Sequence, residues 1–143
     1  MRFSIPLLLV ALFARAASAQ SADSAHADVS AAGTYTEDQA ARGKSVYESY
    51  CSACHTTSFH TDEQFRFNWF GRTVYDLFKT VKTTMPEDNP GGLSDDDYTR
   101  VVTYILKLNG FASGPDSLPA DSLRMKSIRI RAATDTAASP PHP

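Results

Sequence analysis

The feature that most constrains this chain is the pentapeptide at residues 51–55, Cys51-Ser52-Ala53-Cys54-His55. It has the form C-x-x-C-H, which is the attachment signature of c-type haem. In that chemistry the two thiols add across the haem vinyl groups, so Cys51 and Cys54 are the expected thioether positions. His55 is then held next to the ring with its imidazole available to the iron. We expect a chain that folds around one covalently attached haem c.

The spacing of the cysteines by itself is compatible with three more roles for the pair. A redox pair of the thioredoxin type is disfavoured, because there is no βαβ pattern and the pair follows a predicted helix instead of starting one. Half of a zinc site would need more donors, and only His26, His60 and His142 remain as imidazoles. A plain structural disulfide is compatible with export of the protein.

Residues 1–19 have the pattern of a secretory signal peptide. Arg2 is followed by an apolar run from Phe3 to Phe13 and by small residues that end at Ala19. The apolar run, about 11 residues long, is shorter than the roughly 20 that a membrane-spanning helix needs. We therefore expect cleavage near Ala19, a periplasmic or otherwise exported location, and no integral membrane protein after cleavage.

The rest of the chain is predicted to form one domain between two polar extensions. A length of 143 residues with 42% hydrophobic residues gives room for one compact domain. Residues 20–33 are predicted to be a flexible leader, 34–112 the domain, and 113–143 a Pro/Ser/Ala-rich tail that is partly packed and then disordered. Within the tail, Ser127 to Arg131 alternates as a strand does. The net charge of −2 comes without a dense basic block, which argues against nucleic-acid binding.

Three helices are predicted inside the domain. The first begins at a capping-box sequence, Thr36 to Gln39, and its buried stripe is expected to contain Ala40, Gly43, Tyr47 and either Tyr50 or Cys51. A glycine inside a helix favours close packing against another helix. The second helix covers residues 73–82 and stops before a proline, and the third follows Ser94 and ends at Asn109-Gly110.

A six-coordinate haem iron needs a second ligand, and Met85 is the best candidate. It lies directly before Pro86, which keeps this stretch of chain out of a helix. His60 is only five residues from His55, too close to reach the opposite face of the ring easily. Met125, in the tail, is expected to fill the core. A site that is open or ligated otherwise stays as the remaining alternative.

The chain resembles the class I monohaem cytochromes c from Thr36 to about Phe111. The resemblance runs through the segments CSACH, NWFGRTVYDLF, TTMPEDNPGGLS and YTRVVTYILKLNGF. The chain is especially similar to the small periplasmic cytochromes that accompany quinoprotein alcohol and sugar dehydrogenases. This implies an all-α, cytochrome c-like fold of three main helices around the haem, with the first and last helices crossing where Gly43 and Tyr47 meet the last helix near Tyr104.

The resemblance also implies roles for individual side chains. Met85 is implied as the distal ligand, and Trp69 and Arg72 are candidates for hydrogen bonds to the haem propionates, whose charge needs donors when partly buried. Trp69 could instead pack on the ring in an aromatic cluster with its neighbours Phe65, Phe67 and Phe70.

The sequence departs from the family at the residues after the haem histidine. Many members follow that histidine with Gly and, later, with a Pro whose carbonyl accepts the proton of the histidine Nδ1. Here Thr56 follows His55, and no proline occurs before Pro86. The hydrogen-bond acceptor for the His55 ring is therefore unassigned.

The expected function is electron transfer and not catalysis. His and Met ligation gives a comparatively high reduction potential, and a filled coordination sphere leaves no place for a substrate. The partners implied are a donor dehydrogenase and an acceptor oxidase or cytochrome. The alternatives are a haem-based ligand sensor or peroxidase-like protein with an open distal site, and a subunit whose haem anchors a docking module for a dehydrogenase.

Overall fold

A computed structural model describes residues 29–132. The predicted signal peptide, most of the leader and the last eleven residues, 133–143, lie outside the described residues. The helices are α1 (Glu37–Tyr50), the 3₁₀ helix η1 (Thr57–His60), α2 (Asp62–Trp69), α3 (Val74–Thr84), α4 (Asp95–Leu108) and α5 (Ser122–Lys126). The strands are β1 (Val29–Ser30) and β2 (Ile128–Arg129). This predominance of helix confirms the all-α fold class.

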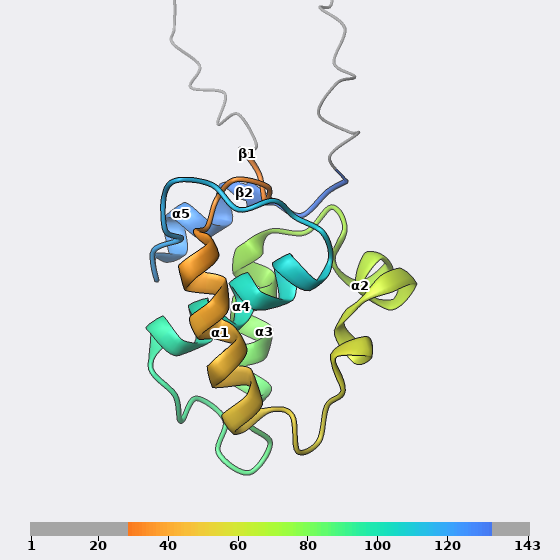
Figure 1. The fold of residues 1–143 in the computed structure, drawn as a ribbon, viewed down its shortest axis with the longest axis vertical. Coiled ribbons are helices and arrows are strands. Elements are labelled where there is room, and N and C mark those ends of the chain that lie inside the picture. Colours follow the sequence, from red (N-terminus) through yellow and green to blue (C-terminus); the bar gives the residue numbers. More distant parts are fainter. Residues whose placement is uncertain (1–28, 133–143) are drawn as a thin grey trace, which may run out of the picture.

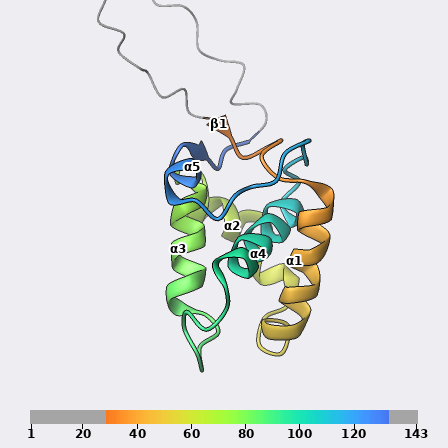
Figure 2. The same cartoon turned by 90° about the vertical axis from the view of Figure 1, so that its left-hand side faces the viewer.

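The centre of the fold is the packing of α4 between α1 and α3 (Figure 2). Gly43 lies where α1 meets α4, and a Cβ built on it would stand 1.9 Å from the carbonyl oxygen of Arg100 and 3.1 Å from Cβ of Tyr104. Only a residue without a side chain fits there. The predicted close approach at Gly43, and its partner near Tyr104, are therefore confirmed.

Only one of the two hydrogen bonds of the predicted capping box forms at the N-terminus of α1. The Thr36 Oγ1 accepts a hydrogen bond from the Gln39 backbone N–H at 3.1 Å. The Gln39 side chain, however, does not return to Thr36. It donates to the carbonyl of Leu118 at 2.7 Å and accepts from the N–H of the same residue at 2.9 Å. The expectation of a complete capping box is wrong, because a backbone partner far along the chain satisfies both ends of the amide.

The buried stripe of α1 comprises Ala40, Gly43 and Tyr47. The choice left open at its end is settled, since Tyr50 is 56% exposed and Cys51 is half-buried. The stripe therefore leads into the first cysteine of the motif.

The other two predicted helices have clear local start and stop signals. A complete capping box at the start of α3 joins Thr73 and Asp76, and sequence reasoning missed it. The Ser94 side chain accepts from the Asp97 N–H at 3.1 Å at the start of α4. Gly110 then has φ +78°, the left-handed conformation that suits a residue after a helix end. The structure places the ends of both helices within about two residues of the predicted ones.

Three further helical segments were not predicted: η1, α2 and α5. Of these, α2 buries only Phe65 and has five polar or charged residues among its eight, so its hydrophobic periodicity is weak. The segments η1 and α5 have four and five residues. Short helices of this kind depend on contacts made by the folded chain more than on their own sequence.

The tail folds back over one end of the bundle (Figure 1). Its apolar side chains are buried against the core at Leu118, Met125, Ile128 and Ile130. The predicted alternation at residues 127–131 corresponds to β2, which pairs in parallel with β1. Part of the predicted flexible leader is thus held in place: Ser30 lies opposite Arg129, and Ala31 is fully buried.

Replacing Gly43 by Ala tests the helix crossing. Alanine is normally the better helix former by about 1 kcal/mol, yet here its Cβ would overlap the Arg100 carbonyl. We expect the free energy of unfolding to fall by about 2 kcal/mol or more, measured by denaturant titration. Ser45→Ala, on an exposed position of the same helix, is the control. Equal stability of the two variants would contradict the role of Gly43.

Asp76 links stability to pH. Burial alone would raise its pKa, but hydrogen bonds from the Thr73 N–H and hydroxyl, at 2.9 and 2.8 Å, and the charges of Arg72 and Arg129 hold the pKa below its usual value. The stabilisation is complete above the unfolded pKa, about 4, and is lost as pH falls through the lower folded value.

We therefore expect Asp76→Asn to cost about 1 kcal/mol near pH 7 and progressively less below pH of about 4. Thermal unfolding at several pH values measures this. The exposed Asp116→Asn is the control, and a deficit for Asp76→Asn that is constant with pH would refute the linkage.

Candidate functional site

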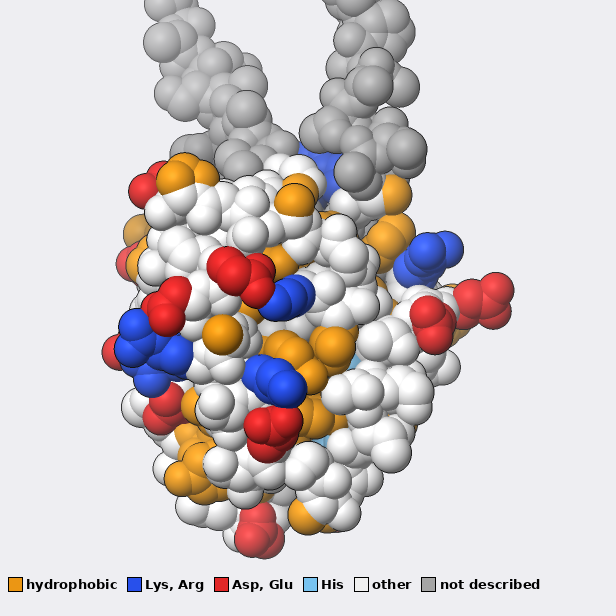
Figure 3. All heavy atoms as spheres, viewed as in Figure 1, with side chains coloured by type: hydrophobic (Ala, Val, Ile, Leu, Met, Phe, Trp, Pro, Cys, Tyr) orange, Lys and Arg blue, Asp and Glu red, His pale blue; other side chains and the backbone are white. Residues whose placement is uncertain are grey.

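A cavity of about 670 Å³ opens between the helices. In the face seen in Figure 3, apolar side chains gather in the middle of the molecule, and histidine atoms are visible among them. The walls of the cavity come from η1, from the C-terminal parts of α1 and α3, and from the core faces of α2 and α4. Residues that line it include Tyr47, Cys51, Cys54, His55, His60, Phe65, Trp69, Leu77, Val81, Met85, Val101 and Ile105.

The C-x-x-C-H segment forms a tight turn at the end of α1. The Cys51 N–H still donates to the Tyr47 carbonyl at 2.8 Å, and the N–H groups of Cys54 and His55 donate to the Cys51 carbonyl at 3.2 and 2.9 Å. The Tyr47 hydroxyl donates to the His55 carbonyl at 3.0 Å. Both thiols are free, and they and His55 line the same cavity. The last turn of α1 thus fixes the backbone of the motif.

Burial changes the acid–base properties of the groups around the motif. It raises the pKa of the Cys51 thiol. Burial, with Cys51 and Tyr104 nearby, raises the pKa of Tyr47 to about 12, so its hydroxyl stays a donor. Burial, and then the neighbouring His55, lower the pKa of His60 to about 4. At neutral pH this imidazole is therefore uncharged.

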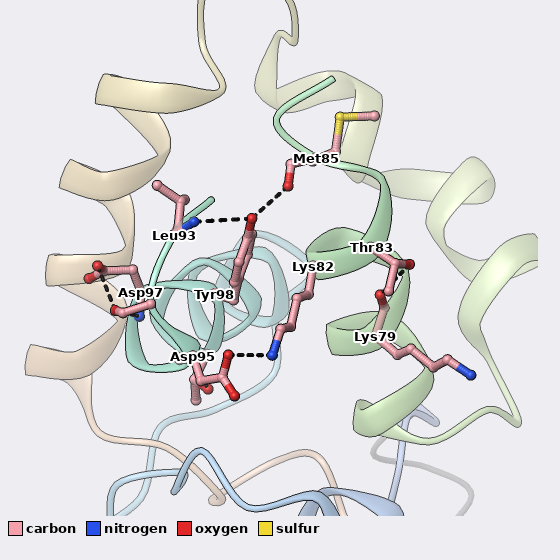
Figure 4. Close-up of polar contacts among 10 residues, drawn as sticks. Lys79, Lys82, Thr83, Met85, Leu93, Asp95, Asp97 and Tyr98 are labelled. Atoms are coloured by element: carbon pink, nitrogen blue, oxygen red, sulfur yellow. Dashed lines mark hydrogen bonds and ion pairs between the residues drawn. The ribbon is translucent and has the colours of Figure 1, made fainter. Parts of the chain in front are cut away.

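Met85 reaches the cavity from the end of α3. It is the C-cap of that helix, and its N–H donates to the Val81 carbonyl at 2.9 Å. Its carbonyl accepts from the Tyr98 hydroxyl at 2.7 Å, and the same hydroxyl accepts from the Leu93 N–H at 3.4 Å. Figure 4 shows the Met85 carbonyl turned toward Tyr98 and its side chain pointing the other way. A single hydroxyl of α4 therefore ties down both ends of the loop after Met85.

The two candidates for propionate contacts lie differently. Trp69 lines the cavity, whereas Arg72 does not. The Arg72 guanidinium stands over the Trp69 ring, 4.8 Å from its centroid. Of the alternative aromatic cluster, Phe65 is buried and meets Phe70 edge-on, but Phe67 is 87% exposed. Phe67 therefore does not belong to a cluster in the cavity.

Sequence reasoning missed several polar residues of the site. Gln64 and Asn68 line the cavity from α2, and Glu87 and Asp88 from the loop after Met85. Gln64 and Asn68 could have been predicted to lie together only if α2 had been predicted as a helix, because residues four apart lie on the same face of a helix. The hydroxyl of Tyr98 was also missed, because its position on the apolar face of α4 predicts burial and not a hydrogen-bond partner.

The donor set fits a covalently bound haem. Two thiols, an imidazole and a thioether share one largely apolar cavity, in which the ring of a haem could be buried. Together with the helical fold and the C-x-x-C-H turn, these are the features expected of a c-type cytochrome domain of class I. Such a domain implies covalently bound haem c with iron.

Comparison with known proteins supports this class. Residues 38–105, somewhat under half of the chain, match the family model described as cytochrome C oxidase, cbb3-type, subunit III. The match lies inside the predicted domain of residues 34–112 and supports a haem-based electron-transfer role. Neither the curated proteins nor the solved structures give a match to the chain. Within residues 29–132, no helix is both long and apolar enough to cross a membrane.

Tyr98→Phe tests how the loop after Met85 is held. Loss of the hydroxyl leaves the Met85 carbonyl and the Leu93 N–H without this partner, at an expected cost of about 1–2 kcal/mol. Amide hydrogen exchange at Leu93 should become faster. The control is Tyr35→Phe, because the buried Tyr35 hydroxyl donates to the Phe111 carbonyl elsewhere in the fold. The control should lose similar stability without faster exchange at Leu93; a Leu93 that exchanges alike in both variants would contradict the tether.

Proposed function

We propose that the protein carries single electrons through one haem c attached at Cys51 and Cys54, with His55 and Met85 as the axial ligands. The observation that carries the proposal is that these four side chains line one cavity although Met85 lies 30 residues beyond His55 in the sequence. When bound, the haem iron supplies one-electron chemistry, since it alternates between the ferric and ferrous states.

The residues of the chain would hold and shield this group. Tyr47 fixes the His55 carbonyl, and Tyr98 fixes the Met85 carbonyl, so both ligands start from restrained backbone. Apolar side chains such as Leu77, Val101 and Ile105 line the cavity and would keep water from the haem. If His55 and Met85 both bind the iron, no position on it would be left for a substrate, which favours a carrier over an enzyme.

His60 favours the carrier over the sensor or peroxidase-like alternative. It is the spare histidine of the cavity, and its ring contacts that of His55, with centroids 5.4 Å apart. A distal acid or base would have to stand opposite His55, next to the open position of the iron. The contact with His55 therefore supports a place for His60 on the His55 side.

We further propose that the carrier works in the periplasm after removal of residues 1–19. Its donor would be a dehydrogenase, in keeping with the resemblance to cytochromes associated with quinoprotein dehydrogenases, and its acceptor an oxidase or another cytochrome. The signal-peptide pattern supports the location.

The two methionines of the described chain provide the test. Oxidised wild-type holoprotein should show the weak far-red band of sulfur-to-iron charge transfer. Met85→Ala should abolish the band and lower the reduction potential, because thioether ligation favours the ferrous state. Met125→Leu should keep both, since Met125 is fully buried under the tail and does not line the cavity. Holoprotein that forms without the band in the wild type would overturn Met85 as ligand and favour the open-site alternative.

A further inference from the structure

The ring of His55 lacks a hydrogen-bond partner within residues 29–132. A histidine that binds a metal through one nitrogen almost always donates its other N–H to an acceptor, which sets the ring orientation and raises the basicity of the ligand. If His55 binds iron, as proposed above, a group of this chain close to the ring is a candidate for that acceptor. The groups that contact the His55 ring are therefore the place to look.

Two rings contact the His55 imidazole, those of Phe59 and His60. Their centroids lie 5.0 and 5.4 Å from that of His55. Phe59 has no polar atom in its side chain, so of these two rings only His60 can accept. The nearby Thr56 hydroxyl bonds to the Ser58 hydroxyl, at 2.9 Å, and not to the His55 ring.

The separation of the two imidazoles suits a direct hydrogen bond. Each ring nitrogen stands roughly 1.2 Å from its ring centre, and a hydrogen bond between nitrogens spans about 3 Å. The two centroids would then be separated by about the observed 5.4 Å when the nitrogens face each other. In the structure the planes are tilted by 59° and the two rings are not hydrogen-bonded, so a rotation of the His55 side chain would be needed to bring its N–H into line.

His60 is also held firmly enough to orient a neighbour. The Asn109 side-chain amide donates to the His60 carbonyl at 2.7 Å and to the Ile105 carbonyl at 2.8 Å, which anchors η1 to the end of α4. The His60 ring packs edge-on against Tyr47, with centroids 5.7 Å apart and planes at 85°. Tyr47 is the residue that fixes the His55 carbonyl. His60 is thus tied to both α1 and α4, and it shares its α1 contact, Tyr47, with His55.

We propose that His60 is a positioning residue for His55, whose free ring N–H it accepts as a hydrogen bond. The inference rests on the proposed function, since it needs His55 bound to iron. By making His55 a stronger electron donor, the bond favours the ferric state and lowers the reduction potential. No proline lies between Thr56 and Pro86 whose carbonyl could accept this N–H. His60 supplies the acceptor instead.

Three variants of the holoprotein test this role by redox titration. His60→Phe keeps an aromatic ring against Tyr47 but cannot accept, so the reduction potential should rise. His60→Gln keeps an acceptor and should restore part of the wild-type value. Phe59→Leu, the matched control, alters the other ring contact of His55 without removing a polar atom, and its potential should stay near that of the wild type. A His60→Phe potential equal to the wild type, or a shift no larger than that of Phe59→Leu, overturns the inference.

A measurement on the unaltered protein covers the case in which His60→Phe fails to mature. In the ferrous holoprotein labelled with ¹⁵N-histidine, the accepting nitrogen of His60 should resonate away from its value in free imidazole and show coupling to the His55 N–H. Absence of both signals overturns the inference. Failure of the proposed function is seen separately, because a wild-type protein without the far-red band fails before any variant is compared.

Discussion

The contact of α1 with α4 at Gly43 is the constraint on which the rest of the structure depends. With no side chain at Gly43, the backbone of α1 comes against the Arg100 carbonyl, and the Tyr47 and Tyr104 rings meet one turn further on, 5.5 Å apart. That contact places the Tyr47 hydroxyl at the His55 carbonyl. A glycine in the core of a helix crossing thereby determines where the C-x-x-C-H turn faces.

Much of the bundle could be predicted because its signals are local. Caps at Thr36 and Ser94, the spacing of buried residues and the proline after Met85 predict α1, α3 and α4 to within about two residues. The partner of the Gln39 side chain could not be predicted, since it lies 79 residues away at Leu118. The same applies to the Tyr98 hydroxyl: a pattern of apolar residues indicates which face is buried but not which carbonyl a buried hydroxyl reaches.

The C-terminal segment shows why composition underestimates order. Residues 113–132 lie beyond the family match, and their apolar residues are few and scattered, which suggests only partial packing. Four of these residues nevertheless reach the core: Leu118, Met125, Ile128 and Ile130 are at most 2% exposed. The Ile130 backbone also pairs with the Gly71 N–H and the Arg72 carbonyl, both at 2.9 Å. Because the bundle supplies a preformed surface, a few well-spaced side chains are enough to order the segment.

Helix α4 holds two segments of the candidate site, one near each of its ends. Tyr98 in its first turn holds the Met85 carbonyl, and Asn109 at its C-cap holds the His60 carbonyl. The two anchors are eleven residues apart in sequence, roughly 16 Å along the axis. Because a helix is stiff over this length, α4 restrains the Met85 carbonyl and the His60 carbonyl relative to each other. Such restraint around the candidate ligands suits the proposed electron transfer, which works best when the coordination sphere changes little between oxidation states.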